Sequence, residues 1–371
     1  MRTCQWAAVI LYMVLMSSTL LAGNSRFFVG TYTTGTTSEG IYTGTLDTET
    51  GEIEGIRAVA EAVNPSFLAR SPLGGFLYAV MEAKGGEVGA FRVDNDGGLA
   101  PLNVRPSGGA EPCHLMVTHS GRHVLVANYT GGSVACLAVA PDGSLGEMTD
   151  TREFEGSGPH PKRQQKSFAH AVVPDTQDRF VYVCDLGADK VWSFQFDSTN
   201  GTLAATEPGC GEVPPGGGPR HFVLSPDGRF AYANNELGLS VTAFRRDPQS
   251  GLLEAFQTLP TSQVSTGPAD GVTTAEIVMH PTGRFLHVSS RGDNTLAGFS
   301  IADDGSLTFL ESQPSVVDAP RGMALDPSGR WLVVAGQKDN RLATFAIDPD
   351  SGRLSPTGFT AEVPAPVCVV F

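Results

Sequence analysis

The sequence predicts an all-β protein, a seven-bladed β-propeller with four-stranded blades. A repeated pattern is the main observation: an apolar run, a turn, an alternating strand, a polar loop, another strand, and a turn ending in Gly-x-Leu. Its clearest copy covers residues 219–253. The first turns of the copies recur every 46 to 55 residues, at Pro72, Ser120, Pro174, Pro226, Pro281 and Pro327. A period near ~50 residues is typical of propeller blades.

The two ends of the chain supply the seventh blade. Residues 27–32 and 41–46 have the pattern of a second and a third strand, with no inner strand before them. Residues 366–371 have the pattern of an inner strand with nothing after it. We therefore expect the N- and C-terminal strands to close the last blade, which removes the open sheet edges that invite aggregation.

A single propeller domain is predicted for residues 24–371, after a signal peptide at residues 1–23. An unbroken apolar run at residues 6–16 follows Arg2, and small and apolar residues continue to Gly23. This pattern is typical of a secretory signal, and we place cleavage after Ala22. We expect export to the periplasm or the medium; a mis-assigned start codon would instead leave the protein in the cytoplasm.

Composition excludes several classes of partner. The formal net charge of −14 argues against nucleic acid and anionic membranes, whose binders supply Lys and Arg. A few converging arginines can still bind a small anion in such a protein. The cysteines lack Cys-x-x-Cys or zinc-type spacing, so we expect them to be small buried hydrophobic residues. We expect no metal and no cofactor, and we leave one disulfide open as an alternative. We expect a monomer or a weak oligomer.

Propeller geometry predicts where unusual polar residues meet. Because the strands of a blade are antiparallel, the start of the inner strand and the loop after the second strand lie on one face. The polar residues at inner-strand starts include His170, Arg220, His221, Glu276 and Arg321, and those of the loops include Glu236, Arg291 and Lys338. Converging cations and titratable groups indicate a ligand site. Each residue alone could be structural, the arginines as partners of carboxylates on neighbouring blades.

A long polar loop at residues 156–166 is expected to lie over the same mouth of the propeller, since long loops in compact folds are often functional.

Several stretches then resemble a known family, the seven-bladed propeller lactonases. This family includes the propeller type of bacterial 6-phosphogluconolactonase and the fungal carboxymuconate lactonizing enzymes. The resemblance covers the whole chain after residue 23, and its most specific stretches are residues 28–33, 156–159, 218–221, 275–277, 281–286, 290–292, 320–322 and 364–369.

The resemblance implies a site made of His170, Arg220, Glu236 and Arg291. These positions coincide with those selected from the repeat. One position departs from the family pattern Pro-His-x-His, because Phe168 stands where the first histidine is expected.

We therefore expect hydrolysis of a sugar lactone, foremost 6-phosphoglucono-δ-lactone to 6-phosphogluconate, by water attack without metal. Glu236 or His170 would act as general base. Arg220 and Arg291 would hold the anionic group or stabilise the oxyanion. The substrate-binding residues would be His221, Glu276, Arg321 and Lys338. The alternatives are a lactonizing cycloisomerase of the muconate kind and a non-catalytic propeller that binds glycans or partners.

Overall fold

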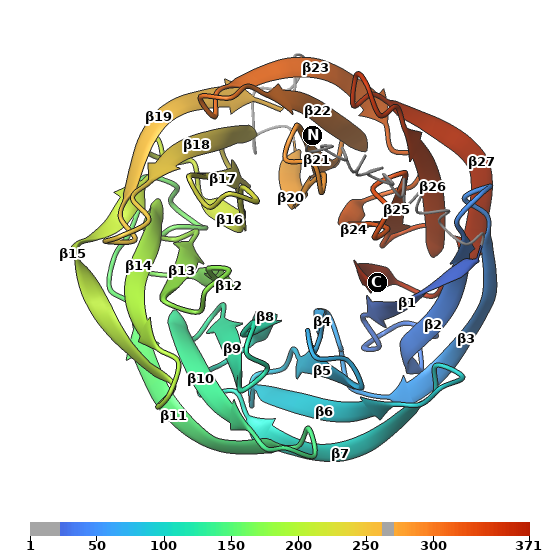
Figure 1. Cartoon of the computed structure of the whole chain (residues 1–371), viewed down its shortest axis with the longest axis horizontal. Coiled ribbons are helices and arrows are strands. Elements are labelled where there is room, and N and C mark those ends of the chain that lie inside the picture. Colours follow the sequence, from blue (N-terminus) through green and yellow to red (C-terminus); the bar gives the residue numbers. More distant parts are fainter. Residues whose placement is uncertain (1–22, 262–270) are drawn as a thin grey trace, which may run out of the picture.

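The chain forms a closed ring of seven four-stranded antiparallel sheets, as the sequence predicts (Figure 1). The computed structural model describes residues 23–261 and 271–371. Residues 1–22 of the predicted signal peptide lie outside the described residues. Within the described residues the secondary structure is strand and turn throughout, without a helix.

Blades 1 to 6 follow one another along the chain. The strands of blades 1 and 2 are β4 (Leu68–Arg70), β5 (Phe76–Met81), β6 (Glu87–Val93), β7 (Leu99–Pro106), β8 (Pro112–Val117), β9 (His123–Asn128), β10 (Ser133–Val139) and β11 (Leu145–Glu153). Those of blades 3 and 4 are β12 (Ala169–Pro174), β13 (Phe180–Asp185), β14 (Lys190–Asp197), β15 (Thr202–Glu212), β16 (Pro219–Leu224), β17 (Phe230–Asn235), β18 (Ser240–Arg246) and β19 (Leu253–Pro260). Those of blades 5 and 6 are β20 (Thr273–Met279), β21 (Phe285–Arg291), β22 (Thr295–Ile301), β23 (Leu307–Pro314), β24 (Pro320–Leu325), β25 (Trp331–Gly336), β26 (Arg341–Ile347) and β27 (Leu354–Glu362).

Both ends of the propeller domain build the seventh blade. Its strand order is β28-β1-β2-β3, where the C-terminal β28 (Pro366–Val370) is the inner strand. The other three strands are β1 (Asn24–Thr31), β2 (Gly40–Asp47) and β3 (Ile53–Glu61). Antiparallel pairing of Phe28 with Val370 and of Gly30 with Cys368 joins the two ends, which confirms the predicted closure.

The Gly-x-Leu turns of the repeat are explained by contacts between blades. Tyr78, Tyr182 and Tyr232 are fully buried on second strands. Each hydroxyl donates to a carbonyl in the Gly-x-Leu turn of the next blade, at Gly143, Gly251 and Gly305, over 3.0, 3.0 and 2.9 Å. These glycines have positive φ angles, between 74° and 83°, which L-residues with a side chain rarely adopt. The repeat therefore encodes the packing of each blade on its neighbour.

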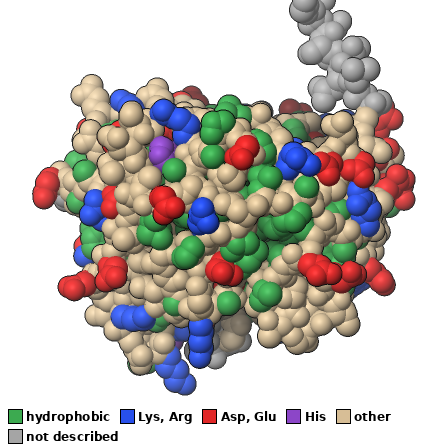
Figure 2. Space-filling model, turned by 90° about the horizontal axis from the view of Figure 1, so that it is seen from below, with side chains coloured by type: hydrophobic (Ala, Val, Ile, Leu, Met, Phe, Trp, Pro, Cys, Tyr) green, Lys and Arg blue, Asp and Glu red, His purple; other side chains and the backbone are tan. Residues whose placement is uncertain are grey.

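The face of the outer wall seen in Figure 2 carries mixed charges, with acidic and basic side chains scattered among apolar ones. Across residues 23–261 and 271–371 the structure contains no helix of the length and apolarity that a membrane span needs.

Candidate active site at the mouth of the propeller

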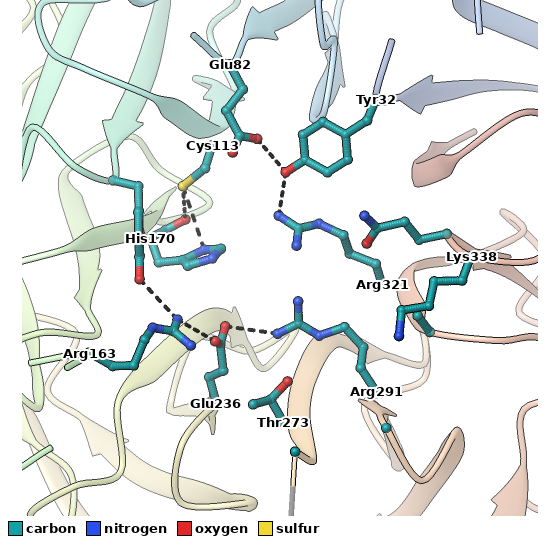
Figure 3. A pocket seen from close by; sticks show the side chains of 15 residues that line it. Tyr32, Glu82, Cys113, Arg163, His170, Glu236, Thr273, Arg291, Arg321 and Lys338 are labelled. Atoms are coloured by element: carbon teal, nitrogen blue, oxygen red, sulfur yellow. Dashed lines mark hydrogen bonds and ion pairs between the residues drawn. The ribbon is translucent and has the colours of Figure 1, made fainter. Parts of the chain in front are cut away.

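A polar cavity of about 510 Å³ opens at the face of the ring where the inner strands begin (Figure 3). Strands and loops of several blades line it, so it depends on closure of the ring. Its polar lining side chains include Tyr32, Glu82, Cys113, Tyr129, Arg163, His170, Glu236, Arg291, Arg321 and Lys338.

β-Bulges at the start of the inner strands aim three side chains into this cavity and a fourth, Arg220, at Glu236 just beneath its surface. In β16 the register passes from Pro219 paired with Asn235 directly to His221 paired with Asn234, so Arg220 is an extra residue. The same irregularity makes Cys113 in β8, His170 in β12 and Arg321 in β24 extra residues. A bulge bends the strand and re-aims its side chain. We call these four residues the mouth ring.

Glu236 lies at the centre of the site and is almost fully buried, with 3% of its side chain exposed. Its carboxylate contacts three guanidinium groups: Arg163 at 2.7 Å, Arg220 at 3.0 Å and Arg291 at 3.3 Å. Burial alone would raise the pKa of Glu236, but the three arginines outweigh burial and lower it to about 2. Glu236 is therefore an anion throughout the neutral range.

The backbone of Glu236 is fixed by the glycine-rich approach to β16. Its N–H donates to the carbonyl of Gly218 over 2.7 Å, and its own carbonyl accepts from Thr274 N–H over 3.2 Å. Gly218 has a φ of 63°, and a Cβ there would lie 2.9 Å from the Leu237 side chain. The run of three glycines in this segment therefore serves close packing beside the site.

Arg163 reaches Glu236 from the loop between β11 and β12, so at least this residue of the predicted loop 156–166 lies at the mouth. The same Nη2 atom also donates to the hydroxyl of Tyr129 over 3.0 Å. The adjacent Gln164 is 1% exposed and donates to the carbonyl of Leu186 and to the carboxylate of Asp189, at 2.9 and 2.6 Å. The loop is therefore anchored beside the residue that enters the site.

Arg321 faces the cavity without a carboxylate in direct contact among the described residues. Its Nη2 donates to the hydroxyl of Tyr32 over 2.8 Å, and that hydroxyl donates to Glu82 over 2.8 Å. Ser66 also hydrogen-bonds Glu82. Burial would lower the pKa of Arg321, but Tyr32 and Glu82 outweigh it and raise the pKa. Burial also raises the pKa of Tyr32, so Arg321 is a permanent cation held by a neutral phenol.

His170 is 5% exposed and presents a neutral imidazole to the cavity. Burial, followed by the charges of Arg220, His221 and Arg321, lowers its pKa well below the usual 6.5. Its Nδ1 lies 3.8 Å from the thiol of Cys113, whose pKa is raised by burial. In Figure 3 the ring lies between Cys113 and the Arg163–Glu236 pair.

The predicted residues divide into two groups. The structure brings His170, Arg220, Glu236, Arg291, Arg321 and Lys338 together at the mouth, with Arg220 beneath the surface and in contact with Glu236. It does not bring His221 and Glu276 to this cavity. They belong to a second layer, which we call the far ring: Phe67, His114, His221 and Glu276.

The far ring borders the opposite face of the propeller. Two adjoining cavities of about 620 and 450 Å³ open there and share Met116, His119, Glu276, Val278 and Met323. His221 directly follows Arg220 in the chain, and the bulge directs the two side chains to different levels along the ring axis. His221 and Glu276 therefore face away from the cavity where we expected them to bind substrate.

Sequence reasoning missed six polar side chains of the cavity: Tyr32, Glu82, Cys113, Tyr129, Arg163 and Thr273. One of them carried a usable signal, because Cys113 follows Pro112 as Arg220 follows Pro219 and Arg321 follows Pro320. Arg163 lies in a loop that was expected over the mouth. The sequence does not show that its side chain enters the cavity, because that depends on how the neighbouring Gln164 anchors the loop.

The mouth is suited to a small anion. Four cations line the cavity, namely Arg163, Arg291, Arg321 and Lys338, against the two carboxylates of Glu82 and Glu236. This excess is local, since the whole chain has a formal charge of −14. In the described part of the chain, no three His, Cys, Asp or Glu side chains are grouped as metal ligands would be. Fold and site together define a propeller with a cationic pocket around a neutral histidine.

The chain belongs to the seven-bladed β-propeller lactonase family, whose model matches residues 26–371. It is 34% identical over 347 residues to the 6-phosphogluconolactonase of Bacillus subtilis, which covers 93% of this chain and 97% of the relative. A crystal structure of a putative 6-phosphogluconolactonase from Bacteroides fragilis superimposes with a TM-score of 0.87 at 34% identity, over 94% of this chain and 98% of that one. The periplasmic gluconolactonase of Pseudomonas aeruginosa gives the same TM-score at 33% identity, over 94% and 99%.

Proposed function

We propose that this protein hydrolyses 6-phosphoglucono-δ-lactone to 6-phosphogluconate at the mouth of the propeller. The observation that carries the proposal is the excess of cations around one neutral imidazole, in a cavity of about 510 Å³. Membership of the lactonase family and the relatives named 6-phosphogluconolactonase support the reaction type. A phosphorylated lactone matches the charge of the cavity better than a neutral one.

His170 is the general base in this proposal. A neutral imidazole can accept a proton from water at pH 7, whereas a carboxylate with a pKa of about 2 is a weak base. Water adds to the carbonyl carbon while His170 takes its proton. The ring C–O bond then breaks, and the leaving oxygen receives the proton from His170.

The arginines divide the remaining work. Glu236 fixes three guanidinium groups in one place, and Arg291, which lines the cavity, stabilises the charge that develops on the carbonyl oxygen. Arg321 and Lys338 line the cavity without forming an ion pair with Glu236, and they hold the phosphate. Substrate binding by His221 and Glu276 has no support from their position and is not part of this proposal.

The test compares two substrates on the purified protein. We expect kcat/KM for freshly generated 6-phosphoglucono-δ-lactone to exceed that for glucono-δ-lactone at least tenfold, after subtraction of spontaneous hydrolysis. The reverse order would overturn phosphate recognition and favour a gluconolactonase, as the relative from P. aeruginosa is named. If neither lactone is hydrolysed, the proposed lactonase activity is wrong, and the lactonizing cycloisomerase or the non-catalytic binding module is favoured.

We also propose export directed by residues 1–23, supported by the apolar run after Arg2. The similar protein from P. aeruginosa is named a periplasmic gluconolactonase, which gives this proposal a precedent. Two measurements test export: fractionation of cells that express the full chain, and mass spectrometry of the purified protein. A mature chain beginning at Gly23 in the periplasm or medium is expected, and a full-length chain confined to the cytoplasm would contradict it.

A further inference from the structure

A buried acid–imidazole pair lies directly behind the proposed site and has no part in the mechanism above. Nδ1 of His221 is 2.5 Å from Oε1 of Glu276, and the two side chains are 5% and 12% exposed. The backbone N–H of Ile277 also donates to Oε1, over 3.1 Å. The pair joins the inner strands of blades 4 and 5, β16 and β20.

Arg220 connects this pair to the mouth. Its Nη1 lies 3.1 Å from Nε2 and 3.5 Å from Nδ1 of His221, and donates to the carbonyl of Ala275 over 2.6 Å. On its other side, Nε of Arg220 is 3.0 Å from Glu236. The guanidinium is thus held between two carboxylates, one in direct contact and one beyond an imidazole.

These contacts fix the proton on His221. A guanidinium can only donate, so Arg220 disfavours a proton on Nε2. Burial, followed by the charges of Arg220 and Arg321, lowers the pKa of His221 well below its usual value, and the ring is neutral. Its single proton therefore resides on Nδ1, where Oε1 of Glu276 accepts it.

We propose that His221 and Glu276 are positioning residues that hold the guanidinium of Arg220 against Glu236, and that ionisation of Glu276 thereby tunes the mouth from the far ring. The inference deepens the proposed lactonase function and depends on it for its kinetic test. Glu276 borders the cavities of the opposite face, so the group that titrates is separate from the substrate's cavity.

The direction of the effect follows from the charges around the pair. Burial raises the pKa of Glu276 to about 7, although Arg220 and His114 oppose the rise. Protonation below that pH removes one of the two negative charges that balance Arg220. The mouth then becomes more cationic, Arg220 is held less firmly, and His170 becomes a weaker base, so kcat should fall as the pH falls through about 7.

The titratable and charged groups that face the pair come from the inner strands packed against it and from the turn after β8. They are His114 of β8, His119 in the turn after β8, His170 of β12, Arg220 of β16, Arg321 of β24 and Cys368 of β28, while the ring of Phe67 before β4 packs on His221. Burial lowers the pKa of His114 and His170 well below 6.5 and raises that of Cys368, so these three do not titrate together with Glu276 near pH 7.

The kinetic test is the pH dependence of kcat in the wild type and in Glu276→Gln. In the wild type we expect kcat to fall about five- to tenfold between pH 8 and pH 6. In Glu276→Gln we expect a low kcat that does not fall over this range, and a KM changed less than threefold. Glu276→Asp should keep the fall in kcat, at a shifted pH. Glu311→Gln, the same substitution in the outer strand of the same blade, should keep the wild-type profile. Parallel profiles of wild type and Glu276→Gln would overturn the proposal.

A second measurement separates this inference from the lactonase function. Imidazole ¹⁵N NMR of the labelled full chain should show His221 neutral and protonated on Nδ1, with shifts that move near pH 7 in the wild type and not in Glu276→Gln. A proton on Nε2, or no dependence on Glu276, would overturn the positioning role even if the lactone is hydrolysed. The expected spectrum without turnover of either lactone would leave the pair in place and overturn only the proposed function.

Discussion

The two ends of the propeller are built from the same inner strands and yet differ in chemistry. At the mouth, cations surround Glu236 and His170, whereas the opposite cavities are lined mainly by apolar side chains, with Glu276 as their one acidic side chain beside Arg70 and three histidines. The difference arises within two consecutive residues, since Arg220 belongs to the mouth ring and His221 to the far ring. The repeat builds the scaffold, and the chemistry comes from positions where the blades differ, at the bulges of the inner strands and in the loops after the second strands.

The sharpest test of this division is removal of the base at the mouth. His170→Gln should lower kcat by about 10²- to 10⁴-fold, because general base catalysis typically contributes that much. Steady-state hydrolysis of 6-phosphoglucono-δ-lactone measures it, with circular dichroism to confirm folding. His119→Gln, at a half-exposed histidine in a turn of the opposite face, is the matched control and should retain wild-type kcat. A loss below tenfold in His170→Gln would assign the base to another group.

Glu236→Gln should affect stability as well as activity. It leaves three guanidinium groups without their shared counter-charge, and breaking a buried ion pair from one side costs about 3–5 kcal/mol of unfolding free energy. Thermal unfolding with and without inorganic phosphate measures the effect. An anion that replaces the lost carboxylate should raise the Tm of the variant more than that of the wild type.

The ionisation of Glu236 should make the stability of the fold depend on pH. Its pKa of about 2 lies below the usual 4.5, so its stabilising contribution is complete above about pH 4.5 and is lost as the pH falls towards 2. The matched control is Glu311→Gln, which removes a pair with the exposed Arg353 at the outer edge of blade 5 and should cost under about 1 kcal/mol. Equal destabilisation of both variants at pH 7 would contradict the central role of Glu236.

Arg321→Gln should act on binding of the phosphorylated substrate. A hydrogen bond to a charged group is worth about 1.5–3 kcal/mol, which corresponds to a rise in KM of about 10- to 100-fold. KM for glucono-δ-lactone should change less than threefold, because it has no phosphate. Arg229→Gln, an exposed arginine in a turn of the opposite face, is the control. An equal rise for both lactones would place the phosphate elsewhere in the cavity.

Much of this architecture was predictable from the sequence because the repeat is explicit. The apolar runs, turns and Gly-x-Leu positions predicted the seven blades and the closure of the ring, and blade geometry placed Arg220, Glu236 and Arg291 at one mouth. Reasoning from strand starts could not separate Arg220 from His221. That separation depends on a bulge, a local break in pairing that the alternation of side chains does not reveal.

The weakest expected effect concerns the loop over the mouth. Arg163→Met removes one of three cations from Glu236, but the other two keep the pKa of Glu236 low, and Gln164 still anchors the loop. We therefore expect kcat/KM to fall only about three- to tenfold and Arg163→Lys to recover part of the loss. Lys162→Met, an exposed cation on the same loop, is the control and should stay within twofold of the wild type. A loss as large as that of His170→Gln would mean that Arg163 touches the reacting atoms. The chemistry of the mouth would then depend on an inserted loop as well as on the bulges of the repeat.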